Sequence, residues 1–273
     1  MKISVAVCTY NGEKYIEEQL NSILDQNLKV DEIVLCDDRS TDDTFDIAKK
    51  TLEKSGVSYR IEKNAENLMV TKNFEKSASL CTGDYIFFAD QDDIWEKDKT
   101  EKMIAAFGEK DDGTVMVFSD AKVVDGDGKF LMPSLYKKGG TFSYLLKDKD
   151  FTDGFIRLNN TVYGCTMAVK REFLSAIFPF VESPANHDGW ICACAPLFGK
   201  TKFIQDALIS YRIHGGNLVG SLGGNGKWDK IIAKQDEFDR RFALQELRSI
   251  RISLMSEAVD RFKGQAVKRN LKE

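Results

Sequence analysis

Three carboxylates lie within four residues of one another, directly after an apolar run. The run Phe87–Ala89 is followed by Asp90, Asp92 and Asp93. Because like charges at this spacing repel and raise one another's pKa, we expect a divalent cation or a hydrogen-bonding ligand to take up the negative charge. Oxygen-only ligation favours Mg²⁺ or Mn²⁺, which commonly bind substrate phosphates. The alternative is that Asp92 or Asp93 caps a helix that begins near Trp95, but a cap needs only one Asp.

A second acidic pair, Asp37 and Asp38, follows another apolar run. Either carboxylate can accept the imide N–H of uracil or thymine, a group that cytosine and the purines do not present in the same way. The structural alternative is that Asp38 starts an Asx-turn and Ser40 caps the next helix. A response-regulator domain also has an acidic doublet, but it places the doublet after its first strand. Here the first apolar run is followed by residues 9–12, which contain no acid.

The chain has only two histidines, and both lie beside other chemically active side chains. His214 follows the cationic Arg212 and precedes glycines that let a ligand approach, which indicates a role on a phosphate or a metal. A lone histidine is otherwise structural or exposed. Asp188 follows His187 at the start of a predicted helix, where it can either cap the helix or act as a general base.

The elements that position these residues follow an alternating pattern through about residue 120. Short β-rich runs alternate with amphipathic stretches, which predicts a parallel sheet covered by helices. The predicted strands span 3–8, 32–36, 57–62, 85–89 and 115–118, and the predicted helices span 13–24, 41–54 and 70–80. Ligands bind at the carboxyl edge of such a sheet. The polar residues that follow the first, second and fourth strands are therefore expected to form one composite site.

The second half of the chain is less regular. Residues 125–128 predict a hairpin turn, 164–169 and 203–213 have strand character, and 187–197 is predicted to be helical. A glycine-rich segment over 215–226 is predicted to be mobile and to mark a domain boundary. Beyond 227 we expect one or two long helices for packing or homo-oligomerisation. The basic residues at the end indicate either a solvated tail or, at most, peripheral contact with an anionic membrane.

Composition excludes several classes of protein. A net charge of -4 over 273 residues and a pI near 5.5 argue against a nucleic-acid binder. The six cysteines lie mostly in apolar runs and are expected to be reduced core thiols of a cytoplasmic protein. Cys192 and Cys194 lack the second pair that a zinc site needs. We see no signal-peptide layout and no apolar run long enough to cross a bilayer, so the expected location is the cytoplasm.

Five of these segments occur in the order found in family 2 glycosyltransferases, which the sequence resembles over about residues 1–217. The segments are Val5–Gly12, Asp37–Asp42, Ala89–Trp95, His187–Asp188 and Tyr211–His214. Members are inverting enzymes of the GT-A fold. The resemblance implies an α/β protein with a mixed, mostly parallel, Rossmann-like central sheet flanked by helices. It also implies a nucleotide-sugar-binding half over 1–120 and an acceptor-side half over 121–217. The glycine-rich segment and the helices expected after it make 218–273 a mobile loop with a C-terminal helical extension.

The resemblance implies roles for individual residues. Thr9, Asn11 and Asp38, with Asp37 nearby, correspond to residues that hold the nucleotide base. Asp90 would lie near the ribose.

The remaining roles concern the metal and the acceptor. Asp92 and His214 correspond to residues on a Mn²⁺ or Mg²⁺ ion at the diphosphate, and Asp188 to the base that activates the acceptor. Arg212 and Trp95 lie within the matching motifs and are further candidates for substrate binding.

One position departs from the family pattern. The family often has a glycine two residues after Asn67, whereas this chain has Met69. The difference weakens any assignment of Asn67 to the nucleotide, and of Asn73 as well, although Asn73 falls at a familiar spacing.

The predicted function is metal-assisted, inverting transfer of a hexosyl or rhamnosyl group from a nucleotide diphosphate sugar to a hydroxyl of a bacterial surface glycan or glycoprotein glycan. The spelling Asp-Gln-Asp-Asp-Ile-Trp and the His-Asp pair resemble bacterial rhamnosyltransferases, which implies dTDP-rhamnose as donor. UDP-glucose, UDP-galactose and UDP-N-acetylglucosamine are the alternatives, because thymine and uracil present the same imide edge.

Two other classes of function are open alternatives. A sugar-nucleotide nucleotidyltransferase would share the base-binding domain, but the sequence lacks its glycine-rich, basic triphosphate loop near the N-terminus. A non-catalytic module that binds a partner through its C-terminal helices would not need Asp92, Asp188 and His214, all of which are present.

Overall fold

The computed structural model describes residues 1–108, 112–136, 162–183, 186–215, 249, 252–254 and 256–262. Within these ranges a single mixed sheet has the strand order β3-β2-β1-β4-β8-β6-β9-β5, and β7 pairs with β6. The predicted glycine-rich segment beyond residue 215 and most of the predicted C-terminal extension lie outside the described residues.

The first half of the sheet is parallel, as the sequence predicts. Strand β1 (Ile3–Thr9) lies between β2 (Glu32–Asp37) and β4 (Tyr85–Ala89), and β3 (Ser58–Lys63) pairs with β2 at the edge. Every residue of β1 and β2 is buried, whereas β3 is largely exposed. Continuous apolar runs form the central strands because both of their faces are covered.

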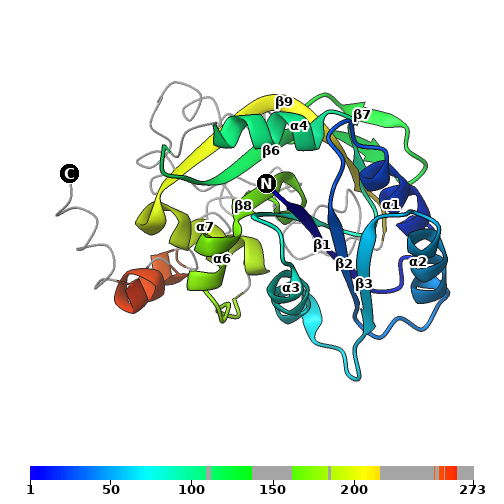
Figure 1. Cartoon of the computed structure of the whole chain (residues 1–273), viewed down its shortest axis with the longest axis horizontal. Coiled ribbons are helices and arrows are strands. Elements are labelled where there is room, and N and C mark those ends of the chain that lie inside the picture. Colours follow the sequence, from blue (N-terminus) through cyan, green and yellow to red (C-terminus); the bar gives the residue numbers. More distant parts are fainter. Residues whose placement is uncertain are drawn as a thin grey trace, which may run out of the picture.

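Helices cover both faces of these parallel strands. In Figure 1, α1 (Ile16–Leu24) and α2 (Thr44–Glu53) lie to one side of β1, β2 and β3, and α3 (Met69–Leu80) lies to the other. The apolar stripe of α1 faces the sheet through Ile16, Leu20 and Ile23. This amphipathic spacing is what identified the crossover helices in the sequence.

The second half makes the sheet mixed. Strand β8 (Met167–Lys170) is antiparallel to both β4 and β6 (Thr114–Asp125) and separates them. The long strand β9 (Lys200–Ile213) is parallel to β6 and antiparallel to the short β5 (Ile94–Trp95). The predicted mixed, mostly parallel GT-A arrangement is confirmed.

The described core also contains α4 (Lys99–Phe107), α6 (Arg171–Ala176), α7 (Asn186–Phe198) and the hairpin from β6 into β7 (Phe130–Met132). The C-terminal helical residues, 252–254 and 256–262, belong to it as well. The hairpin turns where the sequence predicts, with Gly128 N–H donating to the Asp125 carbonyl.

The expectation of a helix that begins near Trp95 was wrong. Trp95 pairs in β5 with Ile209 of β9, and the next helix begins at Lys99.

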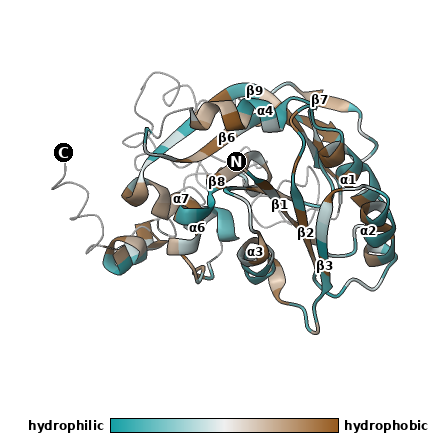
Figure 2. Ribbon diagram, in the orientation of Figure 1, coloured by the Kyte–Doolittle hydropathy of each residue, from teal (hydrophilic) through white to brown (hydrophobic). Residues whose placement is uncertain are grey.

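The interior consists of two apolar clusters, one on each face of the sheet. One contains residues of α3, α6, α7 and the C-terminal helical residues, and the other contains residues of α1, α2 and α4. Figure 2 shows largely hydrophobic stretches on the central strand β1 and on β6, whereas the edge strand β3 and much of α2 are hydrophilic. All six cysteines are free and buried, as expected for core thiols. Among the described residues no helix combines the length and the apolar character that crossing a bilayer requires.

Candidate active site

A cavity of about 310 Å³ lies at the carboxyl edge of the parallel strands. The structure brings five of the candidate residues into its wall: Thr9, Asp38, Asp90, Asp92 and Asp188. His214 contacts this group through Asp92. The other candidates, Asn11, Asp37, Trp95 and Arg212, are not among the residues that line the cavity.

The ends of β1 and β4 are joined by Gln91. The Tyr10 N–H donates to Gln91 Oε1 at 2.7 Å, and Gln91 Nε2 donates to the Tyr10 carbonyl at 3.0 Å. A Cβ on Gly12 would lie 2.3 Å from the Gln91 side chain, so this position accepts only glycine without a rearrangement. The Gln between Asp90 and Asp92 therefore aligns the two strand ends.

Asp37 stabilises the strand ends from behind the cavity wall. Its buried carboxylate accepts hydrogen bonds from Thr9 Oγ1 at 2.9 Å, from the Ser40 N–H at 2.9 Å and from Ser40 Oγ at 2.5 Å. Ser40 therefore binds Asp37 and does not cap α2, which begins four residues later at Thr44. Asn11 has a similar local role, because its Oδ1 accepts the Thr41 N–H at 2.9 Å.

Asp38 is held by the loop that precedes α3. Its Oδ1 accepts from Asn64 Nδ2 at 2.9 Å and from the Leu68 N–H at 2.7 Å, and its Oδ2 accepts from the Met69 N–H at 2.9 Å. Leu68 is in the right-handed helical region and Met69 has φ 62°, so two successive N–H groups converge on one carboxylate. This αR–αL arrangement is an anion-binding nest. It fixes the orientation of Asp38 at the cavity wall.

The three acids after β4 occupy different environments. Asp90 and Asp92 line the cavity, whereas Asp93 is buried behind them. Burial, together with the charges of Asp93, Asp92 and Asp188, raises the pKa of Asp90 well above its usual value. Burial and the charge of Asp92 raise the pKa of Asp93 to about 7. The crowding that the sequence indicates is therefore present, and a cation at this edge would relieve it.

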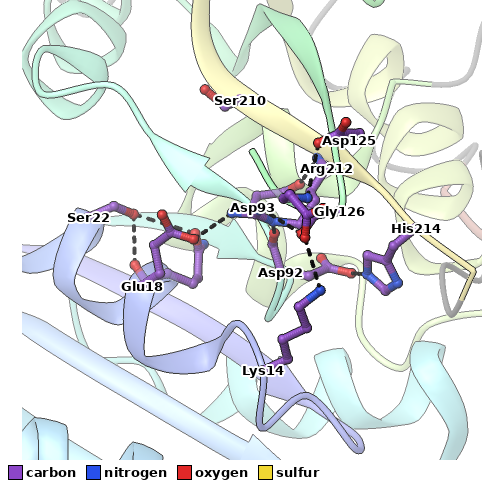
Figure 3. Close-up of polar contacts among 12 residues, drawn as sticks. Lys14, Glu18, Ser22, Asp92, Asp93, Asp125, Gly126, Ser210, Arg212 and His214 are labelled. Atoms are coloured by element: carbon purple, nitrogen blue, oxygen red, sulfur yellow. Dashed lines mark hydrogen bonds and ion pairs between the residues drawn. The ribbon is translucent and has the colours of Figure 1, made fainter. Parts of the chain in front are cut away.

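His214, the residue that follows β9, contacts these acids (Figure 3). His214 Nε2 lies 2.9 Å from Asp92 Oδ2, and the imidazole ring lies 4.8 Å from the ring of Tyr15. Carboxylate oxygen and imidazole nitrogen are both ligands that Mn²⁺ accepts in proteins. Asp92 and His214 fit the metal role that the sequence predicts for them.

Arg212 lies two residues before His214 and joins β9 to the acidic turn. Its N–H donates to Asp93 Oδ1 at 3.0 Å and its Nε to the Asp92 carbonyl at 2.7 Å. The guanidinium also donates to Glu18 Oε2 at 2.5 Å and to the Gly126 carbonyl at 3.3 Å (Figure 3). These contacts engage the guanidinium with protein groups and place it outside the cavity lining.

A second set of possible metal ligands extends from Asp90 in the cavity wall to two residues behind it, but it fits a hard cation poorly. One ligand atom each from Asp90, Asp93 and Cys165 lie within 4.8 Å of one another. Burial and the charges of Asp93 and Asp90 raise the pKa of the Cys165 thiol, so it is protonated and is a weak ligand. The buried Lys99 donates to the Cys165 carbonyl at 2.6 Å and brings a competing positive charge. Burial lowers the pKa of Lys99 to about 8.

Trp95 also lies behind the cavity wall, next to Lys99. The Lys99 ammonium lies 4.3 Å from the centroid of the Trp95 ring, and Phe87 packs on the ring at 5.7 Å. The side chain is buried in the apolar cluster beside α1 and α4. Trp95 therefore supports the acidic turn from the core.

The cavity is also lined by Asp188, which lies in the first turn of α7. Its Oδ1 accepts the Gly189 N–H at 2.8 Å and its Oδ2 the Gly164 N–H at 3.3 Å. The neighbouring His187 stacks on Phe74 with ring centroids 4.0 Å apart, and burial lowers the pKa of His187 to about 3. His187 is therefore neutral.

Gly164 is a site residue that sequence reasoning missed. A Cβ there would lie 2.6 Å from His187 Nε2 and 3.7 Å from the Cβ of Asp188. The only signal in the sequence is a glycine at the start of a strand-like run, which does not distinguish a packing constraint from a turn.

The sheet and the acids that line the cavity define a class of protein: an α/β protein whose acidic strand ends share one cavity with the carboxylate of a later helix. The model of the glycosyl transferase family 2 domain matches residues 4–178. The chain belongs to this family.

Two relatives illustrate the likeness. The chain is 31% identical to an uncharacterized glycosyltransferase, alr2836, of Nostoc sp., over 80% of this chain and 66% of that protein. It is 30% identical to the dTDP-rhamnosyl transferase RfbG of Shigella flexneri, over 79% of this chain and 74% of that protein.

Solved structures show the same fold. TarS 1-349 of S. aureus in complex with UDP-GlcNAc matches with a TM-score of 0.62 at 21% identity, covering 96% of this chain and 72% of that chain. The mannosyltransferase PcManGT of Pyrobaculum calidifontis, in complex with GDP-Man and Mn2+, matches with a TM-score of 0.58 at 17% identity, covering 97% and 75%.

Proposed function

We propose that this protein transfers a sugar from a nucleoside diphosphate sugar to a glycan hydroxyl with inversion at the anomeric carbon. The observation that carries the proposal is that Asp38, Asp92 and Asp188 line the same cavity. These residues supply an acceptor for a base edge, a ligand for a cation and a general base. That combination matches a sugar-nucleotide transferase and is not needed by a non-catalytic binding module.

The donor's base is assigned to the Asp38 end of the cavity. The nest orients the Asp38 carboxylate, and an oxygen has two lone pairs, so Oδ2 can accept an imide N–H as well as the Met69 N–H. Thr9 lines the cavity next to Asp38, while Asp37 and Asn11 support that strand end. Asp90 remains the candidate for the ribose.

The donor that we favour is dTDP-rhamnose, and the support is the likeness to the dTDP-rhamnosyl transferase RfbG. The UDP-sugars are the alternative, since the structural neighbour TarS was solved with UDP-GlcNAc. The acceptor that we propose is a bacterial surface glycan, in line with the polysaccharide relatives such as the putative teichuronic acid biosynthesis glycosyltransferase TuaG of Bacillus subtilis. The proposed location remains the cytoplasm.

Asp92 and His214 would hold a Mn²⁺ or Mg²⁺ ion, which when bound neutralises charge on the departing nucleoside diphosphate. Their geometry supports this assignment, because the two side chains already meet at 2.9 Å beside the cavity. The mutual repulsion of Asp90, Asp92 and Asp93 gives a further reason for a cation at this edge.

Asp188 is proposed to remove the proton of the acceptor hydroxyl while the oxygen attacks the anomeric carbon. The new glycosidic bond forms as the bond to the diphosphate breaks, and the proton remains on Asp188 until solvent takes it. A sugar hydroxyl is a poor nucleophile at neutral pH, so the base is needed. The N–H groups of Gly189 and Gly164 hold the carboxylate in position for this step.

The test is a donor panel scored by released nucleoside diphosphate, with dTDP-rhamnose, UDP-glucose, UDP-galactose and UDP-N-acetylglucosamine, each with and without Mn²⁺. We expect release from dTDP-rhamnose in the presence of acceptor glycan. Activity with UDP-sugars alone would reject the rhamnosyl assignment, and no release from any donor would reject the transferase proposal.

The metal assignment has its own test within this panel. Asp92→Ala is expected to abolish Mn²⁺-dependent binding of the donor, measured by calorimetry. The matched control is Asp127→Ala, whose side chain is 90% exposed on the β6–β7 turn. Unchanged donor affinity in Asp92→Ala would remove Asp92 from the metal site.

A further inference from the structure

Met69 is an exposed apolar side chain at the cavity wall. It is the first residue of α3, lines the cavity and is 67% exposed. Among the large hydrophobic side chains that are exposed in the described part of the chain, only Tyr10 and Met69 line this cavity. An exposed apolar side chain that lines a ligand cavity is available to contact the ligand.

The backbone conformation of Met69 is one that a side chain disfavours. Its φ of 62° lies in the left-handed region, where glycine is the default residue. The nest that binds Asp38 requires this conformation, because it turns the Met69 N–H toward Asp38 Oδ2 at 2.9 Å. A glycine would provide the same N–H without the strain, so the nest explains the backbone and leaves the side chain unexplained.

The site next to Met69 indicates what its side chain contacts. The Met69 N–H binds the carboxylate that is proposed to accept the imide N–H of the donor's base. A thioether packs favourably on an aromatic ring and adapts to its shape. A pyrimidine whose edge faces Asp38 presents a flat π-face, and a neighbouring side chain is well placed to cover it.

We propose that the Met69 side chain forms one face of the nucleobase subsite and packs its thioether against the pyrimidine ring of the donor. This inference rests on the proposed function, since it takes the ligand to be a nucleoside diphosphate sugar. It assigns to Met69 a contribution to donor affinity that depends on the base and is independent of the diphosphate. The residue that departs from the family pattern is thereby given a role in donor recognition.

The experiment compares Met69→Gly with the parent protein, using UDP, dTDP and inorganic pyrophosphate as calorimetric probes in the presence of Mn²⁺. Met69→Gly keeps the N–H that binds Asp38 and removes only the side chain. We expect UDP and dTDP to bind about fivefold more weakly, while the affinity for pyrophosphate, which has no base, stays unchanged. Met69→Leu serves as the matched control and is expected to retain most of the affinity, because it keeps an apolar side chain.

A thermal melt separates this role from a structural one. Because glycine relieves the left-handed strain, Met69→Gly is expected to melt at the same temperature as the parent or higher. Nucleotide affinity equal to that of the parent, or an equal loss for pyrophosphate and UDP, would overturn the inference. If the parent binds neither UDP nor dTDP, the proposed function is rejected. If the parent binds them and Met69→Gly binds them equally well, only the inference about Met69 is rejected.

Discussion

At the scale of single residues, Asp188 carries the chemical step that we propose. Replacing its carboxylate with the amide of Asn removes the base but keeps an oxygen for one of the two N–H groups, those of Gly189 and Gly164, that Asp188 binds. We expect Asp188→Asn to lower kcat by roughly 10²–10⁴-fold, the usual contribution of a general base, with little change in donor affinity. Steady-state transfer kinetics and donor calorimetry measure the two quantities separately.

The control for Asp188→Asn is Asp127→Asn, which changes an exposed carboxylate of the same type. This variant is expected to transfer at the parent rate. Turnover of Asp188→Asn close to that of the parent would exclude Asp188 as the base, and lost donor binding would instead assign it to the donor.

Asp93 makes the stability of the protein depend on pH. Folding raises its pKa from 3.8 to about 7, because the carboxyl is buried beside Asp92. The folded state therefore holds this proton more tightly than the unfolded state, and its contribution to stability is lost as the pH rises from about 4 to about 7. Asp93→Asn cannot ionise and keeps an oxygen for the Arg212 N–H. At about pH 8 we expect it to be more stable than the parent by about 4 kcal/mol, and at about pH 4 to show no such gain.

Urea unfolding at both pH values checks the Asp93 prediction. Asp112 offers a control of opposite sign, because its contact with Lys202 lowers the pKa of the Asp112 carboxyl. Asp112→Asn is expected to lose stability at neutral pH. An Asp93→Asn variant whose stability follows the parent at both pH values would show that Asp93 is not the buried acid that the structure describes.

The sequence predicted which residues lie near the site better than it predicted which of them line the cavity. Asp38, Asp92 and Asp188 follow apolar runs or open a helix, and all three line the cavity. Asp37 and Trp95 lie in the same motifs but are buried behind it. Adjacent residues at a strand end point to opposite sides, and which side becomes the cavity is decided by elements distant in sequence.

At the scale of elements, Arg212 links β9 to the turn after β4 through hydrogen bonds. Its Nε donates to the Asp92 carbonyl at 2.7 Å, and His214, two residues later, contacts the Asp92 carboxylate. A lysine can keep the charge but cannot reproduce the fork of guanidinium donors. We expect Arg212→Lys to weaken Mn²⁺ binding by about tenfold, the size of effect seen when a residue that orients a metal ligand is changed.

Calorimetry with Mn²⁺ alone measures this effect without requiring activity. Arg171→Lys is the matched control, since Arg171 also donates its Nε to a backbone carbonyl, that of Gly83, and is not part of the cavity lining. It is expected to keep the parent affinity. If Arg212→Lys binds Mn²⁺ as the parent does, Arg212 does not position Asp92.

Among the elements, the parallel strands and crossover helices were predictable because each has a continuous apolar run or one apolar stripe. The short strand β5 was not, since two residues carry no periodicity and pair only because β9 lies alongside. Nothing in the sequence indicated that β8 inserts between β4 and β6. Pairing between segments about 50 to 115 residues apart depends on tertiary packing that no local pattern records.

At the scale of the whole molecule, the C-terminal helical residues join the main core. Leu254, Ala258 and Phe262 are buried in the apolar cluster that also contains α3 and α7, and the Phe262 ring lies 5.1 Å from that of Phe198. Figure 1 shows this helix beside α6 and α7. The sequence predicted a boundary near residue 217, and the proposal of a separate extension now has a direct test in the cooperativity of unfolding.

Phe262→Ala is expected to lower the free energy of unfolding by about 3 kcal/mol, because it removes a buried ring from the cluster. Val259→Ala changes the same helix at a position that is 44% exposed, and is expected to stay within about 0.5 kcal/mol of the parent. Urea unfolding followed by both tryptophan fluorescence and circular dichroism is expected to show one transition, shifted as a whole in Phe262→Ala. Trp190 reports on this contact, since its ring lies 6.4 Å from that of Phe262. If Phe262→Ala does not shift the main unfolding transition, the C-terminal helix folds independently of the sheet that carries the site.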